Sequence, residues 1–371
     1  MKNVLIIENS SKFYWGGGQQ ITLMVIKILK DMALGLFIAD YKSNMLFPKL
    51  VNEYIDNTHM LRLYGKCYRN PLTHKESKIL ELLVSFITLP LNILNLYRFC
   101  RKNKLTPENT IIYCITKKVL LIVYFFSLVA KFKYIYHSHM VVNCSGIAGR
   151  LIKKELRKAE KIICVSKTVE KSVPYNNKVL LYNALDYHGK LNKRKGDKFI
   201  VSVVGSIVPV KGFDVFVDSY KYLKHKEKIE YRIYGTGYME EELKSHINII
   251  EDGCIRMMGF QKNILEELAT SSVLVVPTII EESFSLVVLQ AFLIGIPCIV
   301  TNIGGQAENI IEGKNGFLVP INDARSIAEK IDYLISHPKE YEKISEKARN
   351  TYHNFTYNKF EEKIIDIFSN S

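Results

Sequence analysis

The sequence has few of the features that mark exported, fibrous or disordered proteins. Its seven cysteines are an odd number, and none belongs to a CxxC pair. Most lie in apolar runs such as IICVS and IPCIV, which indicates buried, reduced thiols in a cytoplasmic protein rather than disulfides or a structural zinc site. Twenty glycines and ten prolines in 371 residues are too few for a collagen-like or linker-like chain.

Long uninterrupted apolar runs are also missing. The first residues, MKNVLIIENS, become polar too early for a signal peptide. The apolar run at residues 119–130 is too short to span a bilayer and suits a buried helix. The run at residues 79–97 is longer, but it contains Glu81, Pro90 and two asparagines. We therefore expect neither segment to cross a membrane.

Charge is distributed unevenly between the two halves of the chain. The net charge of +14 comes from 51 basic and 37 acidic side chains. Residues 1–190 hold 29 basic and 12 acidic side chains, a balance of +17, and residues 191–371 hold the remaining 22 and 25, a balance of −3. This asymmetry indicates that the first half alone meets an anionic surface or substrate.

Basic side chains gather on one predicted helical face in residues 150–161. They are Arg150, Lys153, Lys154, Arg157, Lys158 and Lys161, which share one side of a helix. Basic residues also flank the apolar segment 79–97 on both sides. A solvated helix face is one explanation. An apolar segment beside basic residues is also typical of a surface that lies on anionic lipid, and we predict a cytoplasmic protein that is peripheral on the inner face of the cell membrane.

Short apolar strands alternate with helical segments in both halves, which predicts an α/β protein with parallel sheets. The expected strands lie at 4–8, 35–40, 110–116, 133–139 and 161–166, and then at 199–206, 231–237, 254–259, 273–278 and 297–302. The polar stretch 188–198 is the best linker, so the predicted domains are 1–190 and 191–371, with the option that the last helix packs back on the first domain.

Three segments that follow predicted strands carry the candidate chemistry. Gly16-Gly17-Gly18 precede a helix, where backbone can approach a ligand closely, although a merely flexible loop is the alternative. Lys211-Gly212 suit a phosphate oxygen, or Lys211 is a solvated loop lysine. In residues 277–319, the start of a helix at Ser283-Phe284-Ser285 could bind an anion beside Glu282; a capped helix with ordinary acidic residues is the alternative there.

A run within the last of these segments resembles the E-x7-E element of retaining glycosyltransferases of family 4. Here the element runs from Glu282 to Gln290 and is followed by Gly295-Ile296-Pro297 and by Gly304-Gly305-Gln306-Ala307-Glu308. Further matches are YHSHM with His139, CVS at 164–166, YNALD at 182–186, GS-x4-KG at 205–212 and YGTG at 234–237. The resemblance extends over nearly the whole chain. It implies the GT-B fold, in which two Rossmann-like, doubly wound parallel-sheet domains face each other across a cleft.

The resemblance also implies an activity. The expected enzyme is a hexosyl- or N-acetylhexosaminyl-transferase (EC 2.4) of cell-surface polysaccharide synthesis. It would move a sugar, with retention, from a nucleotide sugar such as a UDP- or GDP-sugar, bound by residues 191–371, to a glycan or lipid-linked acceptor, bound by residues 1–190.

Particular residues take roles in this resemblance. Lys211 would bind the diphosphate, Glu282 the sugar hydroxyls, and His139 would face the sugar, unless His139 is simply a core histidine at a strand end. The implied donor-binding residues are Gly17, Gly18, Gly205, Ser206, Lys211, Gly235, Glu282, Ser283, Phe284, Ser285 and Gln290.

We expect no metal and no other cofactor. The available aspartate pair, Asp214 and Asp218, has helical spacing on a predicted helix surface. Lys211 and the backbone N–H groups near Phe284 and Ser285 would instead stabilise the leaving diphosphate.

Two positions depart from the family pattern, because Gln290 replaces its second Glu and Ser206 replaces a common Arg. Both changes weaken donor binding on paper, so a non-catalytic sugar-nucleotide-binding subunit is the alternative function. No nucleic-acid partner is expected, since the chain shows none of the usual nucleic-acid-binding modules.

Overall fold

The computed structural model describes residues 2–9, 17–41, 59–65, 78–187, 189, 191–193, 197–250 and 253–370, without the side chains of 78–82, 147 and 148. The chain divides into two compact units. The first comprises Met1–Tyr182 together with Phe360–Ser371, and the second comprises Asn183–Lys359. The boundary falls before the predicted residue 190, because Ala184 and Leu185 are already buried and group with the second unit.

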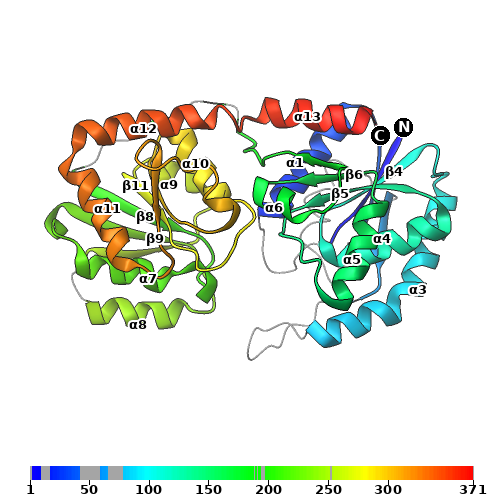
Figure 1. Cartoon of the computed structure of the whole chain (residues 1–371), viewed down its shortest axis with the longest axis horizontal. Coiled ribbons are helices and arrows are strands. Elements are labelled where there is room, and N and C mark those ends of the chain that lie inside the picture. Colours follow the sequence, from blue (N-terminus) through cyan, green and yellow to red (C-terminus); the bar gives the residue numbers. More distant parts are fainter. Residues whose placement is uncertain are drawn as a thin grey trace. The chain divides into compact units, whose positions relative to one another are not determined.

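The first unit contains one parallel sheet with helices packed on it (Figure 1). Its strands are β1 (Asn3–Ile7), β2 (Gly35–Tyr41), β3 (Met60–Leu63), β4 (Thr110–Cys114), β5 (Lys133–Ser138), β6 (Lys161–Cys164) and β7 (Lys178–Leu180). Its helices are α1 (Gly17–Asp31), α3 (Lys78–Lys102), α4 (Lys117–Ala130), α5 (Gly146–Lys158), α6 (Lys167–Ser172) and α13 (Tyr357–Ser369), of which the last begins in the second unit.

The strand order in this sheet is β3-β2-β1-β4-β5-β6-β7, and every neighbouring pair is parallel. Strands β1 and β4 are buried along almost their whole length, as expected for strands covered by helices on both faces. The five predicted strands of this half are present. Strands β3 and β7 were not predicted, since they are short and only partly buried and therefore lack the apolar run that marks the equally short β6.

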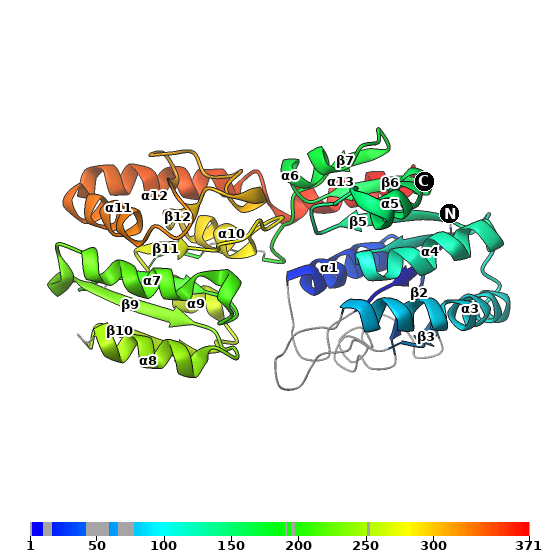
Figure 2. The same cartoon turned by 60° about the horizontal axis from the view of Figure 1, so that its bottom comes forward.

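The second unit has the same plan (Figure 2). Its strands are β8 (Phe199–Val204), β9 (Ile229–Tyr234), β10 (Ile255–Gly259), β11 (Val273–Val276), β12 (Cys298–Thr301) and β13 (Gly316–Val319). Its α-helices are α7 (Phe213–Ser219), α8 (Glu240–Ile250), α9 (Ile264–Leu268), α10 (Leu286–Ile294), α11 (Ala324–Ser336) and α12 (Pro338–Tyr352). Short 3-10 helices are η2 (Pro209–Lys211), η3 (Tyr220–Tyr222), η4 (Lys226–Lys228) and η5 (Gly304–Gln306).

The second sheet has the order β10-β9-β8-β11-β12-β13, again entirely parallel. The two doubly wound sheets confirm the predicted Rossmann-like architecture. In each sheet the order reverses at one place, between β1 and β4 in the first unit and between β8 and β11 in the second. Ligands of such sheets bind beyond the carboxyl ends of the strands at that place, which locates the candidate sites.

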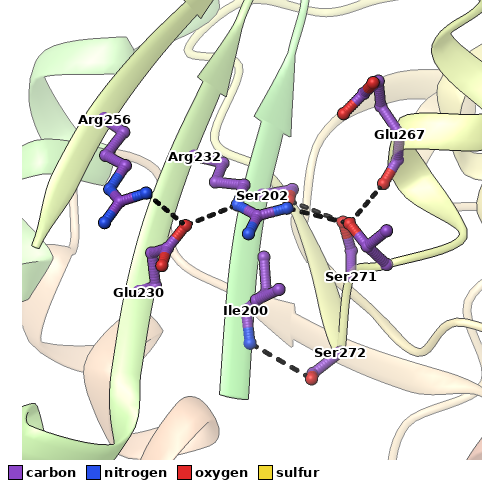
Figure 3. A network of polar contacts seen from close by, with 9 residues as sticks. Ile200, Ser202, Glu230, Arg232, Arg256, Glu267, Ser271 and Ser272 are labelled. Carbon is purple, nitrogen blue, oxygen red and sulfur yellow. Dashed lines mark hydrogen bonds and ion pairs between the residues drawn. The ribbon is translucent and has the colours of Figure 1, made fainter. Parts of the chain in front are cut away.

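A partly buried polar network ties the strands of the second sheet on the amino-terminal side of β11 (Figure 3). The Arg232 guanidinium donates to Glu230 at 2.6 Å and to the Thr270 hydroxyl at 2.9 Å. The Ser202 and Ser271 hydroxyls lie 2.7 Å apart. Because Ser271 precedes β11, this network lies away from the carboxyl ends of the strands, and we interpret it as structural.

Helix α3 contains a long apolar stretch. The stretch Leu83–Lys102 is long and apolar enough to cross a membrane, and 28% of the apolar window within it is buried. Its buried side nevertheless packs within the first unit, where the Asn92 side chain accepts from the Tyr64 N–H at 2.7 Å and donates to the Tyr64 carbonyl at 2.8 Å. Pro90 also lies inside this helix.

The cysteines are not cross-linked in the described part of the chain. Cys100, Cys114, Cys164 and Cys298 are free and buried, and Cys144 and Cys254 are free and partly buried. Cys67 lies outside the described residues. Buried, unpaired thiols agree with the interpretation of these residues as small apolar core groups.

Candidate functional site

The loops that follow β8 and β9 lie directly against each other in the second unit. The Ile207 N–H donates to the Thr236 carbonyl at 3.0 Å, and the Gly205 N–H donates to the Tyr234 carbonyl at 3.0 Å. A Cβ atom on Gly235 would overlap the Gly205 carbonyl. The YGTG and GS segments of the sequence are therefore one packed surface, and the glycine is needed for the close approach of the two backbones.

Lys211 lies at the end of η2, and Gly212 begins the turn into α7. Gly212 has φ of +66°, and a Cβ there would overlap the Pro277 carbonyl after β11. The Ile279 N–H donates to the Val210 carbonyl at 3.0 Å. These contacts hold the lysine loop on the loop that follows β11, although the two segments are far apart in the sequence.

The two charged residues predicted for the second unit form a direct ion pair. The Lys211 ammonium donates to a carboxylate oxygen of Glu282. The Lys211 side chain is 31% exposed and the Glu282 side chain 19%, so both remain within reach of a ligand. The Gly305 N–H donates to the Glu282 carbonyl at 2.7 Å, which fixes the backbone of the acidic residue.

Helix α10 begins beside this pair. Ser285 is the N-cap residue, it is buried, and its side chain makes no capping hydrogen bond. Ser283 and Phe284 are half-buried in front of it. The amide groups and dipole at such a helix start favour an anion. Gln290 lies further along α10, and its Oε1 atom is buried with no hydrogen-bond partner in the described structure.

A second glutamine at this edge was not among the predicted site residues. The Gln306 side chain donates to the Thr301 hydroxyl at 2.9 Å, and that hydroxyl donates to the Thr278 carbonyl at 2.6 Å. The Gln306 Oε1 atom is buried and has no partner among the described residues. A buried acceptor without a donor is costly, so both glutamines are candidates for contacting a ligand. The sequence pattern that could have pointed to Gln306 is the GG-x-x-E loop, in which this residue occupies a variable position.

In the first unit, a buried carboxyl group connects the end of β1 to the start of α1. The Thr22 hydroxyl oxygen lies 3.0 Å from Glu8 Oε2 and 3.0 Å from the Gly18 carbonyl. Burial and the neighbouring Asp40 raise the pKa of Glu8 to about 8. A protonated Glu8 satisfies both contacts, because its O–H donates to Thr22 while Thr22 donates to Gly18. Gly17 and Gly18 open α1, whereas Gly16 lies outside the described residues.

Two histidines lie together at the carboxyl end of β5. The rings of His137 and His139 are 4.3 Å apart between centroids, and the Nε2 atom of each is buried without a partner in the described structure. Burial lowers the pKa of His139 to about 4 and holds that of His137 well below its usual value. The Tyr113 hydroxyl lies 2.7 Å from His137 Nδ1. Both rings are therefore uncharged at neutral pH, and His137 is a further residue that the predicted set did not include.

One member of the aspartate pair, Asp218, is engaged in other contacts. Asp218 pairs with Lys221 at 2.6 Å and with His246 at 2.9 Å on the helix surface. No group of three or more His, Cys, Asp or Glu side chains in the described ranges is arranged to hold a metal ion.

A model of one protein family matches the segment that contains the second-unit site. The family is described as glycosyl transferases group 1, and the match covers residues 185–351. This segment is a group 1 glycosyltransferase domain. Nine of the twelve predicted site residues lie in the second unit with it, and Gly17, Gly18 and His139 lie in the first unit.

Curated relatives of the group 1 domain extend the match beyond it. The chain is 25% identical over 231 residues to the capsular polysaccharide biosynthesis glycosyltransferase CapM of Staphylococcus aureus, covering 61% of this chain and 58% of that one. It is 28% identical over 194 residues to the UDP-Gal:alpha-D-GlcNAc-diphosphoundecaprenol alpha-1,3-galactosyltransferase of Escherichia coli, covering 50% and 49%. The chain thus spans less than two thirds of the length of either relative.

A solved structure resembles the whole chain, and not the group 1 domain alone. HepE of Anabaena in complex with UDP has a TM-score of 0.79 over 100% of both chains at 18% identity. At that identity the likeness shows the fold, which is the GT-B fold predicted from the sequence.

Proposed function

We propose that this protein is a retaining glycosyltransferase of cell-surface polysaccharide synthesis. In this proposal it moves a sugar from a uridine diphosphate sugar to a lipid-linked or glycan acceptor. The observation that carries the proposal is the Lys211–Glu282 ion pair beside the start of α10, at the carboxyl end of the sheet in a group 1 domain. The UDP bound by HepE and the diphosphate-lipid acceptor named for the Escherichia coli relative support the choice of donor and acceptor classes.

The ion pair suits the electrostatic demand of the reaction. As the bond between the anomeric carbon and the diphosphate breaks, negative charge grows on the leaving oxygen. The Lys211 ammonium and the amide groups at the start of α10 would stabilise that charge, and their positions are already fixed by the loop contacts of Gly212 and Gly305. Charges arranged before the reaction starts are the most effective ones.

Glu282 would then have two roles. Its carboxylate holds the Lys211 side chain in place before the donor arrives, and its oxygens can accept hydrogen bonds from hydroxyls of the transferred sugar. The buried Oε1 atoms of Gln290 and Gln306 are further acceptors, and we assign Gln290 to the ribose of the nucleotide. Gln290 accepts without a negative charge, so its contact would be weaker than that of a carboxylate.

The reaction would proceed without an enzyme nucleophile. The acceptor hydroxyl would attack the anomeric carbon from the face that the diphosphate leaves, so configuration is retained and the acceptor proton passes to a leaving phosphate oxygen. Because burial lowers the pKa of His139 to about 4, this residue would serve as a neutral hydrogen-bonding group in the first unit. We expect the reaction to need no metal ion.

A non-catalytic sugar-nucleotide-binding subunit is the second candidate. The residues that favour it are Ser206, where the family pattern has an Arg, and Gln290, where it has a Glu. In this case the protein would bind the donor but transfer nothing.

One experiment separates the two candidates. The purified full-length protein is screened for thermal stabilisation by UDP-sugars, and stabilising donors are then incubated with a diphosphate-lipid acceptor. A ligand at 100 times its dissociation constant stabilises a protein by about 2.7 kcal/mol. Stabilisation with mass-detected transfer supports the enzyme, stabilisation without transfer to any acceptor supports the binding subunit, and no stabilisation by any nucleotide sugar contradicts both.

A further inference from the structure

Helix α3 has apolar side chains on both of its sides, and in the described part of the chain one of these sides is buried and the other exposed. Leu89, Leu96, Phe99 and Cys100 are buried within the first unit. On the other side, the exposed side chains are Leu83, Phe86, Ile87, Leu91, Leu94 and Tyr97, and Ile87 reaches 72% exposure. The spacing of three and four residues places these six side chains, called here the α3 face, along a single stripe.

An exposed stripe of this length is unusual on a soluble domain. The exposed side of a surface helix normally carries charged and polar residues, and a continuous exposed apolar patch marks an interaction site. From Leu83 to Tyr97 the stripe runs for about 20 Å at 1.5 Å per residue. The α3 face is therefore a candidate site for an apolar partner.

Basic side chains border this face on the same layer of helices. Helix α3 packs against α4, and α4 packs against α5, so the three helices form one layer on the first sheet (Figure 1). Beyond the α3 face, Arg98, Arg101, Lys102 and Lys104 are exposed at the end of α3. Across α4, α5 exposes Arg150, Lys153, Lys154, Arg157 and Lys158, called here the α5 stripe.

Acidic groups are nearly absent from this layer. Among the described side chains of α3, α4 and α5, one is acidic. This is Glu155, and it is only 3% exposed. The exposed end of α4 adds two more apolar side chains, Leu128 and Val129. The layer thus combines an apolar stripe with exposed positive charge, the combination that complements an anionic bilayer surface.

We propose that α3 lies in the surface of an anionic membrane, with the α3 face among the acyl chains and the α5 stripe on the lipid headgroups. The helix would lie along the surface rather than cross it, because its other side packs in the first unit and Asn92 is bonded to the backbone of Tyr64. This inference goes beyond the proposed function and does not depend on catalysis. It gives the excess positive charge of residues 1–190 a physical role.

Vesicle binding tests the proposal directly. The full-length protein is sedimented with vesicles of phosphatidylcholine alone and of phosphatidylcholine mixed with phosphatidylglycerol, at low and at high salt. We expect binding to the mixed vesicles at low salt, a steep fall at high salt as the charges are screened, and release of bound protein by alkaline carbonate. Resistance to carbonate would indicate a spanning helix and overturn the proposal.

Two variants divide the apolar from the basic contribution. Ile87→Glu with Leu91→Glu should weaken binding to mixed vesicles by at least about tenfold, since it places charge in the acyl region. Lys153→Glu, Lys154→Glu, Arg157→Glu and Lys158→Glu together should abolish the preference for anionic lipid, because each basic residue near such a leaflet contributes about fivefold. The matched control is Ile249→Glu with Ile321→Glu, two exposed apolar residues of the second unit, which should bind like the wild type.

Melting temperatures and light scattering distinguish membrane binding from misfolding and from self-association. All variants should retain the melting temperature of the wild type, because the altered side chains are exposed. If the wild type ignores mixed vesicles at low salt, the proposal is wrong. If, in addition, Ile87→Glu with Leu91→Glu reduces the molar mass in light scattering, the α3 face is a contact between copies of this chain. The result for UDP-sugar binding does not affect any of these conclusions.

Discussion

The two units place their polar site groups under opposite physical conditions. In the first unit, Glu8 and His139 are held uncharged by burial at neutral pH, with a pKa of about 8 and of about 4. In the second unit, Lys211 and Glu282 are partly exposed and form an ion pair. Uncharged buried groups suit the hydroxyls of a sugar or an acceptor, whereas an accessible ammonium beside a helix start suits a diphosphate. In the proposed function, one sheet architecture would thus serve two kinds of recognition, and the loops after the strands would determine which ligand each unit binds.

The largest effect is expected from removing the positive charge of Lys211 in the second unit. Lys211→Ala should lower sugar transfer by about two to three orders of magnitude, the effect of losing a preorganised charge-stabilising group. Transfer is measured by mass spectrometry with the purified protein. Lys221→Ala is the matched control, since this lysine also pairs with a carboxylate, Asp218, but lies on the helix surface. Near-normal turnover by a folded Lys211→Ala protein would refute the assignment to the diphosphate.

In the first unit, the uncharged Glu8 carboxyl should make the stability of the protein depend on pH. Because the pKa of Glu8 is raised from 4.5 to about 8, the folded protein holds this proton more tightly than the unfolded chain does. The resulting stabilisation is complete below pH 4.5 and is lost as the pH rises towards 8. Glu8→Gln cannot titrate, so it should flatten the decrease in the free energy of unfolding across that range, measured by urea unfolding at several pH values.

Glu160→Gln is the control for this series, since Glu160 is a half-exposed residue that pairs with Lys133 at the surface. It should leave the pH dependence of unfolding as in the wild type. An unchanged pH dependence in Glu8→Gln would mean that the Glu8 carboxyl is ionised in the folded protein, and the contrast between the two units would then not hold.

A smaller effect is expected from removing the buried Oε1 atom of Gln290, which has no hydrogen-bond partner in the described structure. Gln290→Ala should weaken UDP binding about fivefold, which corresponds to one neutral hydrogen bond of about 1 kcal/mol. Isothermal calorimetry measures the affinity, and Gln20→Ala, at an exposed position on α1, is the control. Equal affinity for the two variants would remove Gln290 from the nucleotide site.

Removal of metal ions should have no effect on sugar transfer. If the fixed charge of Lys211 and the amides of α10 supply the electrostatic stabilisation, EDTA should leave transfer unchanged. Loss of transfer with EDTA and its recovery with a divalent ion would show that the second unit recruits a metal to its diphosphate site.

Local patterns in the sequence predicted much of the architecture, because long apolar strands and helix starts leave periodic signals. The strands that escaped prediction are β3, β7 and β13. Strands β3 and β7 are only partly buried, so they lack the apolar run that marks the equally short β6, β11 and β12. The domain boundary was predicted a few residues late, since the polar composition of 188–198 suggested a linker while the burial of Ala184 and Leu185 could not be foreseen.

The residues of the candidate site could be predicted from the sequence only through motifs. The positions of Lys211 and Glu282 after strands were predicted, but their direct pairing joins residues 71 positions apart and leaves no local signal. The contacts of Thr22 with Glu8 and of Gln306 with Thr301 were missed for a related reason. Each depends on how two neighbouring segments fold towards each other, and not on the spacing of residue types.

The return of the C-terminal helix to the first unit has a consequence for synthesis of the protein. Residues 360–371 group with the first unit, and the Phe368 ring packs edge-on against Tyr113 of β4 at 5.5 Å between centroids. Ile364 and Phe368 are almost completely buried there. On the ribosome, residues 183–359 are therefore made before the first unit has all of its core. The first unit therefore completes its core only after the second unit has been synthesised.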